Sequence, residues 1–201
     1  VVEKLESEYD LPCIRLNPHL TRLAFWMWIN DMGHENTRSV TYYFSDGKGE
    51  FNPYREALAW LFGKSEHTGH AVEFALFEQW SKFGERFGIV TPEKRALVRT
   101  KLRSLQREMD ELLSGNEDAI LLFPSHPTLA PFHGQSLCHP ANLAYTSLFN
   151  SLGYPVTQVP IQLSADGVPI GVQIVAGKNR DYLTLSAAEE FERLFGGWVE
   201  P

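Results

Sequence analysis

Apolar residues recur every three or four positions through the first half of the chain, which predicts a series of amphipathic helices. The first helix is expected at Val1–Tyr9, followed by a short strand at Leu11–Leu16. Asparagine or threonine before proline marks later helix starts, because such a side chain caps free amide groups and proline fits the first helical turn. Such pairs predict helix starts at Asn17, Asn52 and Thr91, and apolar spacing predicts a further helix from His67 to Trp80.

The pattern changes in the second half of the chain. Ala119–Phe123 is a short, continuous apolar run, as expected of a buried strand. Further apolar runs predict two strands on either side of the Asp166-Gly167 turn, and helical spacing returns at about 142–152 and from Asp181 onward. Helices followed by strand, helix, strand, strand and helix favour an α/β fold with a mixed sheet and a helical insertion ahead of it.

Composition excludes several classes of protein. The chain has 201 residues, of which 43% are hydrophobic and 21% charged, as in ordinary globular proteins. Its formal charge is −7 and it has no basic block, so nucleic acid is not an expected partner. Two cysteines are too few for a disulfide scaffold and suit a reducing compartment.

A serine nucleophile usually lies in a turn flanked by glycines, which exposes its hydroxyl beside amide donors. Ser136 has Gly134 two positions before it but lacks a glycine two positions after it, where Cys138 stands. The sequence contains no phosphate-binding loop, dinucleotide fingerprint, HExxH or CxxC motif. By its motifs alone, the chain shows no catalytic machinery.

Histidines offer an alternative, a metal-dependent hydrolase. The side chains that could form a zinc site with an open position are His126, His133, His139 and Cys138. Their spacing fits no standard zinc pattern, and the prolines among them suggest a stiff loop with exposed rings. His67 and His70 stand about one helical turn apart, in a spacing that allows chelation but equally suits two solvated histidines. No metal or other cofactor is predicted.

Aromatic residues are dense before position 81. The cluster comprises Phe25, Trp26, Trp28, Tyr42, Tyr43, Phe44, Phe51, Tyr54, Trp60, Phe62, Phe74, Phe77 and Trp80. These residues suit either the core of a helical insertion or an apolar tunnel or membrane-facing cap for a lipid-like ligand. The candidates for the wall of a substrate pocket are Trp28, Phe74, Phe77 and Val172.

Several longer segments carry a family resemblance. The segment Leu121–Pro131 is similar to the strand and Pro-x-x-Ala-Pro loop of the amidase signature family. The segments Asn142–Pro160 and Asp166–Gly177 resemble its next helix and strand and its Gly-x-Pro-x-Gly-x-Gln strand, and Phe195–Val199 resembles its ending. The amino-acid sequence of these segments is most similar to animal fatty-acid amide hydrolases of the second type. The similarity is strong after Ala119 and looser before it.

Several residues of these segments also have direct physical uses. Pro124, Pro127 and Pro131 stiffen a loop that leaves a strand, so that the loop can form a fixed wall. Gly171 permits close approach of a neighbouring backbone, and the Gln173 amide is suited to satisfy backbone groups at the end of the sheet.

The resemblance implies that the protein hydrolyses carboxylic amides, with fatty-acid amides as the expected substrates. Members of the family use a serine nucleophile, a bridging serine and a lysine base, with a Gly/Ser-rich loop as oxyanion hole. None of these elements can be assigned to a residue here. Because the chain begins at Val1 inside an amphipathic pattern, we expect it to be a carboxyl-terminal piece, inactive alone, with the Ser-Ser-Lys machinery upstream.

This interpretation predicts the domain organisation of the chain. Residues 1–118 are expected to form a mostly helical variable region of the amidase domain, and residues 119–201 its carboxyl-terminal portion, with helices on both faces of the sheet. The expected partners are a lipid amide, the upstream portion of the same protein and a membrane surface touched peripherally. The expected location is intracellular, with any membrane anchor upstream. The alternatives are a non-catalytic module that binds a lipid or a partner, and the metal-dependent hydrolase.

Overall fold

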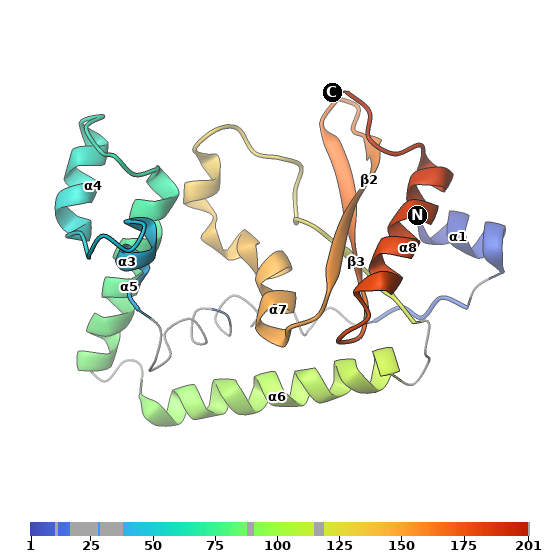
Figure 1. Ribbon diagram of the computed structural model, residues 1–201, viewed down its shortest axis with the longest axis horizontal. Helices are drawn as coiled ribbons and strands as arrows, with labels where there is room; N and C mark the ends of the chain where they lie inside the picture. The colour runs from blue at the N-terminus through green and yellow to red at the C-terminus, as the bar shows by residue number, and fades with distance from the viewer. Residues whose placement is uncertain (11, 17–27, 29–37, 88–90, 115–118, 201) are drawn as a thin grey trace. The chain divides into compact units, whose positions relative to one another are not determined.

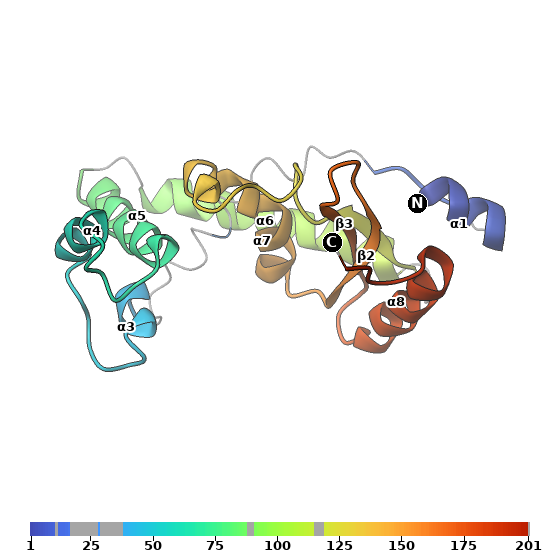
Figure 2. The same cartoon turned by 90° about the horizontal axis from the view of Figure 1, so that it is seen from above.

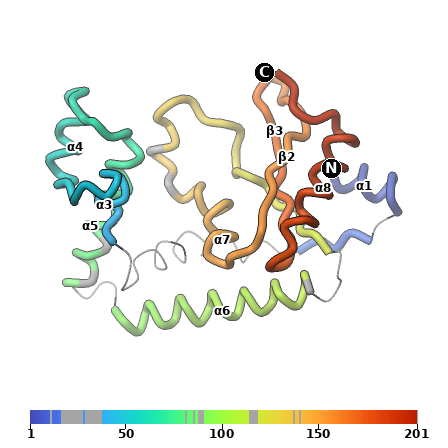
Figure 3. Tube along the Cα trace, viewed as in Figure 1, coloured from blue at the N-terminus to red at the C-terminus, as the bar shows by residue number. Residues whose placement is uncertain are grey.

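The computed structural model describes the helices and strands along most of the chain (Figures 1 and 3). The described residues are 1–10, 12–16, 28, 38–87, 91–114 and 119–200. The α-helices there are α1 Val2–Tyr9, α3 Val40–Phe44, α4 Pro53–Leu61, α5 Gly69–Arg86, α6 Pro92–Ser114, α7 Ala144–Leu152 and α8 Asp181–Phe195. Two 3₁₀ helices, η2 Gln135–Cys138 and η3 Pro140–Leu143, precede α7, and the strands are β1 Leu121–Pro124, β2 Val156–Leu163 and β3 Pro169–Val175.

Local capping explains where several helices begin and end. The Asn52 side chain accepts hydrogen bonds from the amides of Tyr54 and Arg55, and Pro53 occupies the first helical position of α4. Gly153 and Gly196 end α7 and α8 in the left-handed conformation, with φ of 71° and 90°. The predicted starts of α4 and α6 are confirmed, as is the predicted end of α7 at Leu152.

Other sequence predictions differ from the structure. The strand expected at Leu11–Leu16 is wrong for residues 12–16, which have no regular structure. These residues are exposed, Ile14 by 82%, and Pro12 has no amide hydrogen for a strand ladder. The helix expected to begin at Asn17 lies outside the described residues, except for Trp28. The helix expected from His67 to Trp80 begins at Gly69 and continues to Arg86.

The described contacts divide the chain into two compact units, which we describe separately. Unit 1 comprises Val1–Trp28, Arg103–Ala130 and Ala141–Pro201, and unit 2 comprises Ile29–Leu102 and Pro131–Pro140. Each unit is therefore assembled from segments distant in sequence. The predicted division after residue 118, which concerns two portions of one domain, stays a prediction.

The sheet of unit 1 has the strand order β1-β3-β2, and both of its pairings are antiparallel. The mixed sheet expected from the sequence is therefore wrong for the strands described here. β1 and β2 run in the same direction and are joined through α7, but β3 lies between them and separates the parallel pair. β1 is an edge strand, which explains why Leu121, Leu122 and Phe123 are half-buried rather than buried as predicted.

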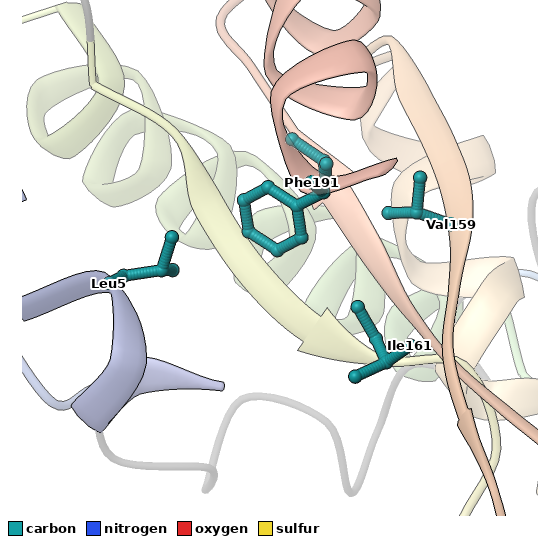
Figure 4. Close-up of a cluster of buried hydrophobic side chains, with 5 residues drawn as sticks. Leu5, Val159, Ile161 and Phe191 are labelled. Carbon is teal, nitrogen blue, oxygen red and sulfur yellow. The ribbon is translucent and has the colours of Figure 1, made fainter. Parts of the chain in front are cut away.

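Helices cover both faces of this sheet, as predicted. In both Figure 1 and Figure 2, β2 and β3 lie between α7 and α8. On the α8 face, Phe191 packs against Val159 and Ile161 of β2, and Leu5 of α1 completes the cluster (Figure 4). On the α7 face, the ring of Phe149 meets that of Phe123 edge-on, with centroids 5.2 Å apart. The sheet is thus the centre of the core of unit 1.

α6 joins unit 1 through the second half of its length. Its side chains Leu105, Met109 and Leu113 are buried. The Tyr154 hydroxyl, just after α7, donates a hydrogen bond of 2.6 Å to Asp110 Oδ1 of α6. Burial first, and then this carboxylate, raise the pKa of Tyr154 well above its usual range.

Gly171 marks a close approach between β3 and β2. A Cβ atom at this position would lie 2.1 Å from Gln158 Nε2 and 2.6 Å from the carbonyl oxygen of Val159. The pairing of Gly171 with Pro160 stands beside a β-bulge between Pro160 and Gln162. The close backbone approach expected at Gly171 from the sequence is confirmed.

α1 is fastened to α8 by polar contacts. Lys4 Nζ donates a 2.7 Å hydrogen bond to the carbonyl oxygen of Leu194 at the end of α8. The Tyr9 hydroxyl donates to Glu190 and accepts from Arg193, and Arg193 Nε lies 3.0 Å and 3.1 Å from the two Glu190 oxygens. The three side chains form one network between the two helices.

We expect the stability contributed by this network to fall at acid pH. Hydrogen bonds from Arg193, and then from Tyr9, lower the pKa of Glu190 to about 2. Because the pKa in the unfolded chain is about 4.3, the contribution is complete above that pH and is lost as pH falls towards 2. Glu190→Gln should therefore be less stable than the parent at neutral pH, and the gap should narrow between about pH 5 and pH 2 in urea unfolding.

Glu189→Gln, at an exposed position beside Glu190 on α8, is the matched control. Its difference from the parent should stay nearly constant over the same pH range. If the difference in stability between Glu190→Gln and the parent were also constant over this pH range, the network would not be the cause of the acid sensitivity.

Candidate functional site

The loop that leaves β1 is held by the side chain of Gln173. This glutamine lies on β3 on the α7 face of the sheet and is only 5% exposed. Its Nε2 donates hydrogen bonds to the carbonyl oxygens of Pro124, at 3.0 Å, and Tyr145, at 3.2 Å. One amide group thus connects the start of the loop to the first turn of α7. The sequence-based expectation that Gln173 satisfies backbone groups at the end of the sheet is confirmed.

Three side chains of the loop, those of Ser125, His126 and Thr128, also make hydrogen bonds. Ser125 Oγ donates a 2.5 Å hydrogen bond to Gln158 Oε1 on β2. The Nδ1 atom of His126 lies 3.3 Å from the amide nitrogen of Thr128 and 3.2 Å from its hydroxyl. With prolines at 124 and 127 restricting the backbone, residues 124–130 of unit 1 form an anchored surface that we call the loop wall.

The four predicted pocket residues belong to different units. Phe74 and Phe77 lie on α5 in unit 2, where both side chains are half-buried. Val172 lies on β3 in unit 1 and packs against the hydrophobic cluster on the α8 face. Trp28 is half-exposed and is assigned to unit 1. Their assignment to a substrate pocket stays a prediction.

Many apolar side chains of unit 2 are exposed. Trp80 on α5 is 79% exposed, and Tyr54, Leu58 and Leu61 on α4 are 62%, 57% and 71% exposed. The interpretation of the aromatic cluster as plain core therefore does not account for Tyr54 and Trp80, two members of that cluster. Three of the exposed side chains, Tyr54, Leu58 and Leu61, lie at helical spacing on one face of α4.

A shallow hollow of about 400 Å³ lies beside the loop after α3. The Phe51 ring stacks on the His67 ring at its edge, with centroids 4.3 Å apart. The charged residues that line the hollow are Asp46, Lys48, Glu50 and Glu66. Because carboxylates and an ammonium group contribute to its wall, the hollow does not suit an acyl chain.

The histidines do not assemble into a metal centre in the part of the chain that the structure describes. No group of three or more His, Cys, Asp or Glu side chains there is placed to hold a metal ion. His126 is occupied with Thr128, and His139 Nδ1 lies 3.4 Å from the Gln135 carbonyl oxygen. The metal-dependent hydrolase receives no support from these residues.

His67 and His70 also have separate neighbours. The His67 ring stacks on Phe51, whereas His70 Nε2 lies 3.0 Å from Ser136 Oγ of η2. The second contact joins positions that are 66 residues apart, and sequence reasoning did not bring them together. The only signal was the glycine at position 134 before Ser136.

Comparison with protein families gives one match, to the family model described as Amidase, over residues 70–185. The matched range contains the loop wall, Gly171 and Gln173.

No helix among the described residues combines the length and apolar character needed to cross a membrane.

The curated relatives include two animal proteins. "Fatty-acid amide hydrolase 2-A" of Danio rerio is 37% identical over 206 residues, which cover 100% of this chain and 37% of that protein. "Fatty-acid amide hydrolase 2" of Homo sapiens is 37% identical over 185 residues, which cover 90% of this chain and 33% of that protein. The chain thus spans about a third of the length of these relatives.

The fold is also similar to that of a solved structure. "Crystal structure of amidase" superposes with a TM-score of 0.50 over 72% of this chain and 32% of that chain, at 20% identity. This likeness concerns the fold alone.

Proposed function

Because the chain belongs to the amidase family, we propose that it is part of a serine hydrolase that cleaves the carbon–nitrogen bond of linear amides, with fatty-acid amides as substrates. The observation that carries the proposal is the 37% identity to "Fatty-acid amide hydrolase 2-A", which extends over 100% of this chain. The half-buried aromatic side chains Phe74 and Phe77 add to it, since an acyl chain requires apolar walls.

In this proposal the chain contributes to binding rather than to the chemical step. The loop wall, anchored by Gln173, is a rigid surface of the kind that positions a substrate. The apolar contacts are assigned to Trp28, Phe74, Phe77 and Val172. The serine nucleophile, bridging serine and lysine base are assigned to a part of the protein outside this sequence, which is consistent with the 37% share of the Danio rerio relative that it matches.

A chimera tests this assignment. The chain would replace the matching segment of the Danio rerio relative, and hydrolysis of a long-chain primary fatty amide would be measured for the chimera and for the chain alone. We expect turnover by the chimera and none by the chain alone. A folded chimera without amidase activity, or amide turnover by the chain alone, would overturn the proposal.

Lipid binding without hydrolysis is a second candidate function. It is favoured by the exposed apolar face of α4, where Leu61 is 71% exposed. Mass spectrometry of lipids extracted from the purified chain distinguishes the two. A stoichiometric lipid together with an inactive chimera would support binding alone.

A further inference from the structure

Three side chains of unit 2 form a hydrogen-bonded series that ends on a serine. Ser136 Oγ lies 3.0 Å from His70 Nε2, and His70 Nδ1 lies 3.4 Å from Glu73 Oε2. A hydroxyl, an imidazole and a carboxylate in this order are the groups that activate serine nucleophiles in unrelated folds.

The direction of the hydrogen bonds follows from the chemistry of the carboxylate. An ionised Glu73 can only accept, so the proton between it and His70 must be carried by Nδ1. In the neutral imidazole, Nε2 is then the acceptor, and the Ser136 hydroxyl donates to it. This is the tautomer in which an imidazole can remove a proton from serine.

Both elements that carry these groups are fixed locally. His70 lies in the first turn of α5, where the Thr68 hydroxyl accepts the amide hydrogen of Ala71. Ser136 lies in η2, entered through Gly134 at φ 83°, and its carbonyl oxygen accepts from the amide of His139. Gly134 therefore serves the turn before the serine, as the glycine of a nucleophile turn does.

We propose that Ser136 is a second, independent nucleophile that reacts with small activated esters, with His70 as its base and Glu73 as the residue that orients His70. Ser136 Oγ attacks the ester carbonyl carbon, a new carbon–oxygen bond forms, and the proton of Ser136 passes to His70 Nε2. The bond to the aryl oxygen breaks, the aryl oxide leaves, and the acyl group stays on Ser136. His70 gives up its proton to bulk water and then takes one from the water molecule that attacks the acyl carbon. The bond between that carbon and Ser136 Oγ breaks, the carboxylic acid leaves, and His70 Nε2 returns its proton to Ser136 Oγ.

The substrate class follows from the setting of the site. The side chain of His70 is 52% exposed and that of Glu73 is 28% exposed, so the reacting groups are open to water. An aryl oxide leaves without being protonated, whereas an amine must receive a proton as the bond breaks. Activated aryl esters are therefore the substrates that suit Ser136. Their hydrolysis is a separate reaction from the fatty-amide hydrolysis proposed above.

The experiment uses the chain itself with p-nitrophenyl acetate. We expect a burst of p-nitrophenolate and an acetyl group on the peptide that contains Ser136. Ser136→Ala should remove the acetylation, and His70→Gln, which keeps a hydrogen-bonding group but no base, should slow it by about 10²-fold. Glu73→Gln should slow it less, because it removes only the charge beside Nδ1.

Ser7→Ala is the matched control, since the exposed Ser7 hydroxyl on α1 donates to the carbonyl oxygen of Lys4, which is not a base. This variant should react as fast as the parent. Circular dichroism would establish that each variant is folded. Acetylation that continues unchanged in a folded His70→Gln variant, or that maps to another serine, would show that the Ser136–His70 contact only fastens η2 to α5.

Discussion

Replacing Gly171 by alanine is expected to lower the free energy of unfolding by about 3 kcal/mol, as overpacking does in tightly packed cores. The new Cβ would lie 2.6 Å from the Val159 carbonyl oxygen, which belongs to the backbone of the paired strand. The strands cannot separate there without weakening the pairing of Val159 with Val172 next to it. Urea unfolding followed by circular dichroism measures the loss.

Two further variants identify the cause of this loss. Gly177→Ala is the matched control, because a Cβ atom at this position would lie 3.6 Å from the nearest atom, Cδ of Arg180. This variant should change the free energy of unfolding by less than about 1 kcal/mol. Adding Gln158→Ala to Gly171→Ala removes the side-chain clash but leaves the clash with the Val159 carbonyl, so it should restore only part of the stability. Equal stability of the Gly171 and Gly177 variants would show that the strand tolerates a side chain at position 171.

Replacing Gln173 by leucine is expected to cost about 2 kcal/mol, because two carbonyl oxygens lose a donor at a buried position. Those oxygens belong to Pro124 and Tyr145, which the glutamine holds together. Gln173→Glu should cost more than Gln173→Leu, since a carboxylate would face the same two oxygens without a hydrogen to donate. The urea midpoint measures the cost in the chain.

The effect on the loop wall can be measured in the chimera. If Gln173 positions the loop, Gln173→Leu should lower the activity of the chimera at temperatures where the protein remains folded. Gln162→Leu, at an exposed position of β2, is the control and should alter stability by no more than about 0.5 kcal/mol. A Gln173 variant as stable and active as the Gln162 variant would contradict the anchoring role.

The features that the sequence predicted well depend on neighbouring residues. Asn52 and Pro53 start α4, and Gly153 ends α7, because capping involves only atoms within one turn. The roles of Gly171 and Gln173 were also predictable, since a glycine among apolar strand residues and a glutamine near a strand end each have few structural uses.

The features that could not be predicted depend on which distant segments pair. Residue pattern identified β1 and β2 as strands, but it does not encode that β3 is placed between them and makes every described pairing antiparallel. The same holds for the contact of Ser136 with His70, which requires η2 to pack on α5. Periodicity reports which side of an element is apolar but not what that side meets.

The position of β3 in the sheet also affects the order in which the protein can fold during synthesis. Among the described strands β3 is made after β1 and β2, yet it is the strand to which both of them bond. When β1 and β2 have been synthesised, the strand with which both of them pair does not yet exist. Leu121 can pair with Val175 only after Val175 has left the ribosome. Contacts between such distant positions slow folding and leave strand edges open in the nascent chain. Chaperone dependence of this region during translation is the expected consequence.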